Sequence, residues 1–150
     1  MSDVGIRHAE PADHARVVGV LDEWWGGRHM VDMLPKLFFV HFRETSFVAE
    51  RDDQLAGFLV GFLSQSLPRE AYVHFVGVNP TERGTGLGRE LYERFFAVAR
   101  ADGRTRVSCV TSPRNSGSLA FHRALGFEPS PPQVGYDGPG EDRVVLTRSL

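Results

Sequence analysis

Glycines gather in one short stretch, residues 79–88, that could bind an anion. The stretch reads N-P-T-E-R-G-T-G-L-G, follows an apolar run at 71–78 and precedes an amphipathic pattern at 87–100. These patterns predict a strand, a tight glycine turn and a helix start. The first N–H groups of a helix have no partner inside it and lie at the positive end of its dipole, so they bind phosphate readily. The stretch therefore predicts a site for a phosphate-bearing cofactor.

The spacing of the glycines narrows the class of cofactor. The dinucleotide fingerprint G-x-G-x-x-G fails because Arg89 stands where its last glycine is needed, and no lysine follows the glycines as a P-loop requires. The stretch instead fits [Q/R]-x-x-G-x-[G/A], with Arg83, Gly86 and Gly88 at the defining positions. This pattern resembles the pyrophosphate-binding loop of the GNAT superfamily of N-acetyltransferases, which holds acetyl-coenzyme A.

A second motif strengthens the resemblance. Residues 115–127 read N-S-G-S-L-A-F-H-R-A-L-G-F, which is similar to the family's Asn-containing helix that ends in F-Y-x-x-x-G-F. The resemblance implies the acyl-coenzyme A N-acyltransferase fold, with a central mixed β-sheet of about six or seven strands flanked by about four helices. The fold class is α/β, with parallel and antiparallel strands mixed in one sheet as in α+β folds. We expect residues 1–150 to form one N-acetyltransferase domain. Acetyl-coenzyme A is the implied cosubstrate, without a metal.

The resemblance also assigns cofactor contacts to particular residues. Backbone groups of Val76, Gly77 and Val78 would bind the pantetheine arm as an added strand. Asn115, assisted by Ser118, would contact the pantetheine from the other side. The pyrophosphate would lie against the backbone of the turn, namely Arg83, Gly84, Thr85, Gly86, Leu87 and Gly88. The alternatives are a turn without a ligand, a plain N-cap at Asn115 and solvated arginines at 83 and 89.

The implied reaction is acyl transfer from a thioester to an amine, which needs a proton acceptor. An alkylamine is about 99.9% protonated at neutral pH, and its ammonium form cannot attack. His74 is the first candidate, because its strand resembles that of arylalkylamine N-acetyltransferases, in which a histidine belongs to the proton path, and because histidine titrates near neutral pH. Strand alternation would place it on one face with Val76 and Val78, unless a bulge follows His74. The alternatives are a histidine bonded within the core, and Glu70 as the base.

The departing thiolate should then take a proton. The tyrosine that serves this step in the family is replaced here by His122. His122 could donate, Tyr136 or Tyr72 could replace it, or water could suffice, because a coenzyme thiol should have a pKa not far from the value of about 8.5 for cysteine. A packing role for His122 is the alternative. The oxyanion would be stabilised by a backbone N–H near Val78.

The acceptor would bind where the first two helical patterns meet. Trp24, Trp25 and His29 stand there, and exposed tryptophans offer aromatic walls and cation–π contacts to an amine. Tyr72 is the fourth residue predicted to contact the acceptor. Three nearby acids could attract a cation: Asp22, Glu23 and Asp32. Packing of the tryptophans in the core is the alternative. The chain therefore predicts a small-molecule or peptide amine as acceptor without naming it.

The elements that must position these residues alternate along the chain. Periodicity predicts strands at 4–8, 47–50, 55–63, 71–78, 107–111 and 144–147, with a short strand beginning at 127. It predicts helices at 12–25, 30–42, 87–100 and 115–124. Pro35 falls inside the second helix and should kink or divide it. The apolar strand at 55–63 should be covered on both faces.

Composition is that of a soluble globular protein, with 41% hydrophobic and 24% charged residues. A net charge of -2 argues against nucleic acid as a partner. Cys109 is the single cysteine, which favours a reducing cytoplasm, and its place in a strand predicts a buried, unreactive thiol. We find neither a signal peptide nor a membrane span. Many members of the family pair into homodimers, so the resemblance leaves that option open here.

Two other functions compete with the enzyme. An acyl-coenzyme A-binding or sensing module of the same fold would bind without turnover, and the missing tyrosine favours it. A nucleotide-binding α/β domain is disfavoured because the glycine stretch fails both nucleotide fingerprints.

Overall fold

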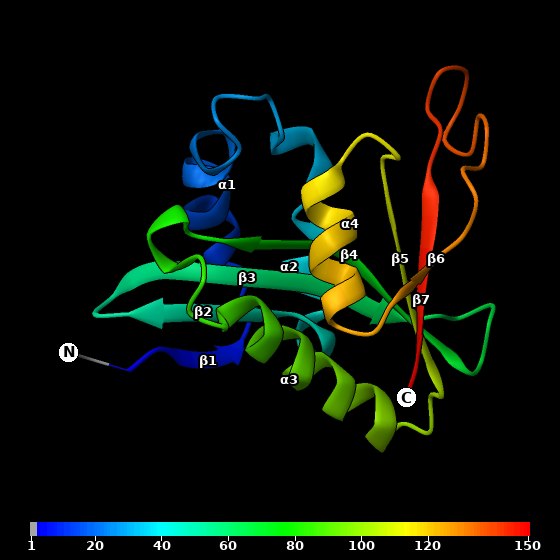
Figure 1. The fold of residues 1–150 in the computed structure, drawn as a ribbon. Helices are drawn as coiled ribbons and strands as arrows, with labels where there is room; N and C mark the ends of the chain where they lie inside the picture. Colours follow the sequence, from blue (N-terminus) through cyan, green and yellow to red (C-terminus); the bar gives the residue numbers. More distant parts are fainter. Residues whose placement is uncertain (1–2) are drawn as a thin grey trace. The chain divides into compact units, whose positions relative to one another are not determined.

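The computed structural model describes residues 3–150 (Figure 1). Seven strands are hydrogen-bonded in the order β1-β2-β3-β4-β5-β7-β6. Their bounds are β1 Gly5–His8, β2 Phe47–Arg51, β3 Gln54–Leu63, β4 Glu70–Val78, β5 Arg106–Thr111, β6 Glu128–Pro129 and β7 Val144–Ser149. The chain forms two compact units, one made of residues up to Phe62 with Val73–Val98 and the other of Leu63–Tyr72 with Ala99–Leu150.

Four α-helices and three 3₁₀ turns lie between the strands of the described residues. They are α1 Asp13–Trp24, η1 Val31–Met33, α2 Leu37–His41, η2 Arg43–Thr45, η3 Pro80–Glu82, α3 Leu87–Ala101 and α4 Ser116–Ala124. A mixed seven-stranded sheet with four helices is the predicted fold class, which is confirmed. Within residues 3–150 no helix is both long enough and apolar enough to cross a membrane.

Local chemistry explains two of the boundaries. The helical pattern predicted at 30–42 is divided at Pro35, as expected: the structure has η1 before it and α2 after it, because its ring and missing N–H interrupt a helix. The hairpin between β2 and β3 turns at Asp52 and Asp53, which have φ values of 51° and 63°. Positive φ at both central residues is the two-residue turn that matches the twist of antiparallel strands.

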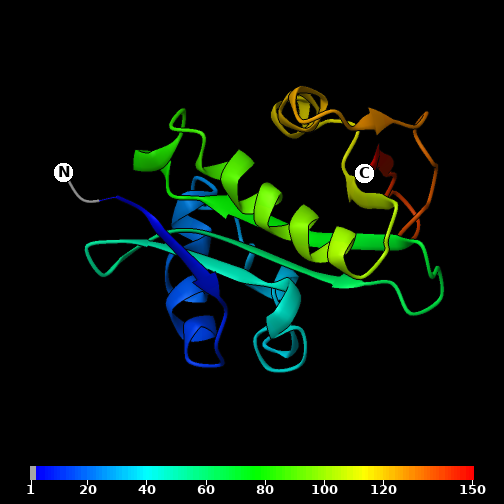
Figure 2. The ribbon, with the colours of Figure 1, turned by 90° about the horizontal axis from the view of Figure 1, so that it is seen from below.

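In the first unit, helices cover the sheet on both faces. Figure 2 shows α1 and α2 on one side of the strands and α3 on the other. Two neighbouring residues of β3 show the same division: the Cβ position of Gly57 lies 3.3 Å from side-chain atoms of Leu87 and Leu91 in α3, whereas Phe58 packs against Trp24 of α1. The apolar strand is therefore buried between two layers, as predicted.

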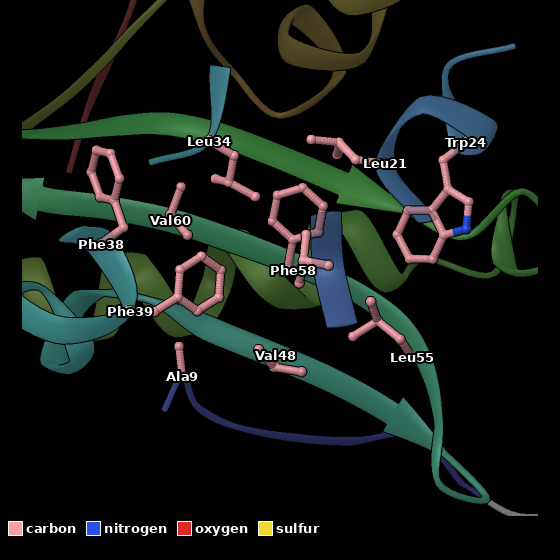
Figure 3. Packing of buried hydrophobic residues seen from close by; sticks show 11 residues of the cluster. Ala9, Leu21, Trp24, Leu34, Phe38, Phe39, Val48, Leu55, Phe58 and Val60 are labelled. Carbon is pink, nitrogen blue, oxygen red and sulfur yellow. The ribbon is translucent and has the colours of Figure 1, made fainter. Parts of the chain in front are cut away.

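A hydrophobic core fills the space between β2, β3, α1 and α2 (Figure 3). Its buried members are Ala9, Val17, Leu21, Trp24, Leu34, Phe38, Phe39, Val48, Leu55, Phe58 and Val60. Aromatic side chains from three segments, α1, α2 and β3, meet in it, and partly buried rings, including Trp25, Phe62 and Phe75, pack against it. Each such ring removes a large apolar area from water, so this core holds the N-terminal helices against the sheet.

The second unit mixes parallel and antiparallel pairing. The start of β4 pairs in parallel with β5, from Glu70 opposite Arg106 to Tyr72 opposite Ser108. β5 pairs in antiparallel fashion with β7 over its whole length. Cys109 is buried in β5, as predicted.

Candidate active site

The glycine turn leaves the end of β4 and is anchored there by Asn79. The Asn79 side-chain amide donates to the Leu55 carbonyl at 3.1 Å, and its backbone N–H donates to the Ala56 carbonyl at 2.8 Å. Its side-chain oxygen accepts a hydrogen bond from the Thr81 N–H at 3.0 Å, which caps η3. Asn79 thereby holds the turn to β3. The Asn-Pro pair, which favours turn initiation, is the sequence signal that could have found it.

Two glycines give the turn its shape. Gly84 and Gly86 have φ values of +79° and +86°, a region that side chains other than glycine's rarely adopt. Among residues 3–150, apart from each glycine and its two chain neighbours, no atom lies within 4 Å of the position that a Cβ would take at either residue. The backbone is thus exposed to open space just before α3, whose first N–H groups, those of Leu87 and Gly88, have no acceptor within the helix. This arrangement fits an anionic group.

A buried carboxylate precedes the glycines, and sequence reasoning missed its role. Glu82 is 8% exposed and forms an ion pair with Arg51 of β2. The Arg51 Nε lies 2.6 Å from the Glu82 Oε1. The hydrogen bond from the Arg51 guanidinium to Glu82 raises the pKa of Arg51. An unpaired carboxylate at this place would repel an anion on the turn. Arg51 neutralises that charge and fastens the turn to the β2–β3 hairpin.

Arg83 makes a contact that the sequence did not predict. Its Nη2 donates to the carbonyl oxygen of Trp24 at 3.0 Å, across 59 residues of chain. Phosphate contact and solvation were the two roles considered for this side chain. The structure adds a third, since the guanidinium binds the C-terminal end of α1.

The two tryptophans at the end of α1 differ in their surroundings. Trp24 is 6% exposed and stacks on Phe58, with ring centroids 6.3 Å apart, so it belongs to the core. Trp25 is only partly buried and meets the edge of Phe75 at 5.0 Å. A Cβ on Gly77 would lie 2.5 Å from Phe58 and 2.9 Å from Trp25. Gly77 therefore allows both rings to lie close to β4.

His74 is held by the loop that precedes α2. Its Nε2 lies 2.6 Å from the Met33 carbonyl oxygen, and its ring stacks on Phe38 at 4.7 Å. A carbonyl can only accept a hydrogen bond, so Nε2 carries the proton. The neutral ring is therefore the Nε2–H tautomer, which leaves the lone pair on Nδ1. That nitrogen is the atom able to take a proton.

Strict alternation along β4 is interrupted next to His74. His74 stacks on Phe38, and its neighbour Phe75 packs on Phe58, although both of these rings belong to the same core. Two successive side chains of β4 therefore contact the same core, which strict alternation does not predict and a bulge would allow. Of the two arrangements predicted for His74, regular alternation with Val76 and Val78 or a bulge after His74, these contacts fit the second better.

His29 lies among carboxylates at the exposed start of the loop. Its Nε2 is 3.1 Å from Asp32 and its Nδ1 is 3.6 Å from Asp22. The hydrogen bond and charge of Asp32, followed by the charge of Asp22, raise the pKa of His29. Asp22 also accepts the Met30 N–H at 2.7 Å. The acids predicted to attract a cation are thus partly engaged with His29 and the loop backbone.

In the second unit, the His122 side chain is buried and is bonded to the backbone of its own helix, α4. It is 5% exposed, its Nδ1 lies 2.8 Å from the Ser118 carbonyl oxygen, and its ring meets the edges of Phe121 and Phe127. Because that carbonyl can only accept, Nδ1 carries the proton of the neutral ring. Burial lowers the pKa of His122, so the ring is neutral at neutral pH. The proton on Nδ1 is directed at the helix backbone.

The other predicted residues of the second unit have partners of their own. The Asn115 side-chain oxygen caps α4 by accepting the Ser118 N–H at 3.0 Å, a bond that leaves the amide NH₂ unused by the cap. Burial raises the pKa of Tyr72, which therefore stays protonated. The Glu70 carboxylate is paired with Arg106 at 2.8 Å.

The first unit thus contains the turn with Arg83, both tryptophans and His74. His29 belongs to the same unit and lies in the connection between α1 and α2 that also carries Met33, the partner of His74. His122, Asn115, Ser118 and Tyr72 lie in the second unit, as described above. Among residues 3–150, no three His, Cys, Asp or Glu side chains are grouped as metal ligands.

Comparison with known proteins decides the family. The model of the acetyltransferase (GNAT) family matches residues 14–127, which include both glycine-turn and α4 motifs. The chain belongs to the GNAT family. The structure of diaminobutyrate acetyltransferase EctA from Paenibacillus lautus, in complex with L-2,4-diaminobutyric acid and coenzyme A, superposes with a TM-score of 0.77 at 20% identity, over 99% of this chain and 96% of that one.

Curated acetyltransferases are similar to this chain over part of their length. L-2,4-diaminobutyric acid acetyltransferase from Nocardia farcinica is 36% identical over 84 residues, which is 56% of this chain and 44% of the relative. Mycothiol acetyltransferase from Thermobispora bispora is 37% identical over 89 residues, 54% of this chain and 29% of the relative. The chain therefore spans less than half the length of either relative.

Proposed function

We propose that this GNAT protein is an acetyl-coenzyme A-dependent N-acetyltransferase, with residues 1–150 as one catalytic domain. The observation that carries the proposal is the open glycine turn at the start of α3, with glycine-only φ angles at Gly84 and Gly86 and free space beside both. Membership of the GNAT family supports it. The acceptor would be the primary amine of a small molecule or peptide, as the diaminobutyric acid relatives suggest.

The residues of the turn fit a pyrophosphate. Backbone N–H groups of Gly84, Gly86, Leu87 and Gly88 would bind it, at the positive end of the 15-residue helix α3, whereas those of Arg83 and Thr85 donate within the turn. Val76, Gly77 and Val78 would bind the pantetheine through their backbone, and Asn115 with Ser118 would add a contact through the amide NH₂. When bound, acetyl-coenzyme A supplies an acetyl group activated as a thioester. No metal is part of the proposal.

His74 would receive at Nδ1 the proton that the acceptor's ammonium group loses before the neutral amine attacks. Its Nε2–H bond to Met33 fixes the ring orientation and the tautomer, as a base held by a second group requires. Attack requires the neutral amine, and the amine would lose its proton to Nδ1 directly or through one water.

The acid step has two candidates in the second unit. The geometry of His122 favours packing, because its ring proton faces the Ser118 carbonyl and burial lowers its pKa. Tyr72 remains protonated because burial raises its pKa, so it can donate a hydrogen bond. We propose that a tyrosine or water replaces His122 in protonating the thiolate, and that His122 supports α4.

The acceptor side would be formed by Trp25 and His29. Trp25 is the more accessible tryptophan and offers a ring face or edge to a cation, while Trp24 supports it from the core. Asp22 and Asp32 surround His29 and give this loop a negative character that suits an ammonium group.

Thermal unfolding tests the cofactor part of the proposal. Acetyl-coenzyme A should stabilise the protein by about 2.7 kcal/mol at one hundred times its dissociation constant, whereas ATP and NAD should not. Gly86→Val should abolish this shift, because a β-branched residue resists positive φ, while Gly5→Ala, at a site with open space and ordinary φ, should retain it. No shift of the wild-type protein with acetyl-coenzyme A would overturn the proposal.

A sensing module without turnover is the second candidate, favoured by the buried, neutral His122 in place of the family's tyrosine. A panel of amines with a free-thiol readout separates the two. Release of coenzyme thiol with any amine establishes the enzyme, and binding without release across a broad panel establishes the sensor. Cytoplasmic location, a homodimer, and the absence of nucleic-acid or membrane partners stay predictions.

A further inference from the structure

The C-terminal end of α1 is closed by two glycines and one distant arginine. The Gly26 N–H donates to the Glu23 carbonyl at 3.1 Å and the Gly27 N–H to the Asp22 carbonyl at 2.8 Å, with Gly26 at a φ of +68°. This pair of bonds is the Schellman motif, which satisfies two of the last carbonyls of a helix. The next carbonyl, that of Trp24, accepts from Arg83.

The Arg83 contact is suited to its place. The last carbonyls of α1 lie at the negative end of the helix dipole, where a guanidinium is favoured. A hydrogen bond from a charged donor is worth more than one between neutral groups. The bond is partly buried, so water competes for it less than at the surface.

The same residue belongs to the glycine turn through its backbone. The Arg83 N–H donates to the Pro80 carbonyl at 3.4 Å, directly before Gly84. The turn itself is anchored to β2 and β3 by Arg51–Glu82 and by Asn79. Arg83 therefore joins the turn to α1 through its side chain, while its neighbours attach the turn to the hairpin.

The bond between Arg83 and the Trp24 carbonyl also affects the positions of both tryptophan rings. Trp24 stacks on Phe58 of β3 and Trp25 meets Phe75 of β4, so both rings depend on where α1 ends. A change at the turn that shifts the Arg83 guanidinium would move the Trp24 carbonyl and, with it, the adjacent Trp25.

We propose that Arg83 is a positioning residue that couples occupation of the glycine turn by coenzyme A to the placement of Trp25 on the acceptor side. The inference rests on the proposed function, because it needs a phosphate-bearing ligand at the turn. Binding at the turn orders the Arg83 backbone, and the guanidinium keeps its bond to the Trp24 carbonyl, so the end of α1 is ordered too. Coupling is reciprocal, and an acceptor held at Trp25 tightens coenzyme A by the same factor.

Tryptophan emission tests the coupling, because Trp24 and Trp25 are the two tryptophans of the chain. Coenzyme A at saturation should change the emission of the wild-type protein. Arg83→Met should lose most of that change while its calorimetric affinity for coenzyme A falls by only about fivefold, the lower end of ordinary coupling. Arg83→Lys, which can still donate one hydrogen bond, should recover part of the change. Arg94→Met removes an exposed charge of α3 and should behave as wild type.

Two results would overturn the inference. One is an undiminished emission change in a folded Arg83→Met protein at saturating coenzyme A. The other is an affinity loss above about thirtyfold with the emission change retained in the complex, which marks a direct phosphate contact. Failure of the proposed function looks different, because the wild-type protein would then not bind coenzyme A in the calorimeter at all. Circular dichroism of each variant establishes that it is folded.

Discussion

His74 and His122 each donate a ring N–H to a backbone carbonyl, but over very different lengths of chain. His74 reaches Met33, 41 residues away, whereas His122 reaches Ser118, four residues back in the same helix. The first bond joins β4 to the loop before α2, so it reports on the tertiary fold. The second survives any movement of α4 as a whole. A histidine that joins two segments can place a proton acceptor, while one bonded inside its helix mainly fills space.

The strongest test of this comparison is the loss of His74, the proposed base. His74→Gln should lower kcat by about 10²–10⁴-fold, the usual contribution of a general base. The glutamine amide can still donate to Met33, so the loop should stay in place. Steady-state kinetics across pH, with an amine found in the panel, provide the measurement.

A second histidine provides the control. His14 donates to the carbonyl of Leu34, next to Met33, at 2.9 Å from α1. His14→Gln should leave kcat within about threefold, below the range of general-base effects. Equal losses in the two variants would mean that His74 only supports the loop.

Truncation of His122 should be the next largest effect, and on stability rather than on catalysis. His122→Ala leaves a cavity beside Phe121 and Phe127 and should cost about 2–4 kcal/mol of unfolding free energy in denaturant titrations. His122→Phe restores volume and should change kcat by less than about tenfold. A kcat loss of a hundredfold in the phenylalanine variant would make His122 the acid.

The cap of α4 tests the local region further. Asn115→Ala should cost about 1 kcal/mol, because the Ser118 N–H loses its acceptor, whereas Asn115→Asp should keep the stability. If Asn115 also binds the pantetheine through its NH₂, the aspartate variant will bind coenzyme A more weakly despite its intact cap. Equal coenzyme A affinity of the aspartate variant and the wild type would leave Asn115 as a cap alone.

The pH dependence of stability gives the smallest effect. Because burial lowers the pKa of His122 in the folded state, the unfolded chain binds the extra proton first as pH falls below about 6.5. Protonation of His122 in the unfolded chain therefore lowers the free energy of unfolding progressively as the pH falls below about 6.5. Above that pH, His122 gives no pH-dependent change in stability. His122→Phe should lose less stability than the wild type between neutral and mildly acidic pH, as measured by chemical denaturation. Parallel curves would contradict the burial argument.

The sequence by itself determined the local elements and the turn. Period-two and helical patterns predicted the strands and helices to within a few residues, because burial of one face imposes those periods. Gly84 and Gly86 were identified from their spacing, since positive φ at a helix start needs glycine. The family followed from the same residues together with the motif at 115–127.

Only the tertiary structure decided which side chains serve one another. The Arg83–Trp24 bond spans 59 residues and the Arg51–Glu82 pair 31, and no local pattern marks either of them. The contacts of His74 with Phe38 and of Phe75 with Phe58 join distant segments, and strand periodicity does not contain them. Local conformational preferences depend on neighbouring residues, so they can be recognised in the sequence. Contacts between distant segments form only when folding brings those segments together.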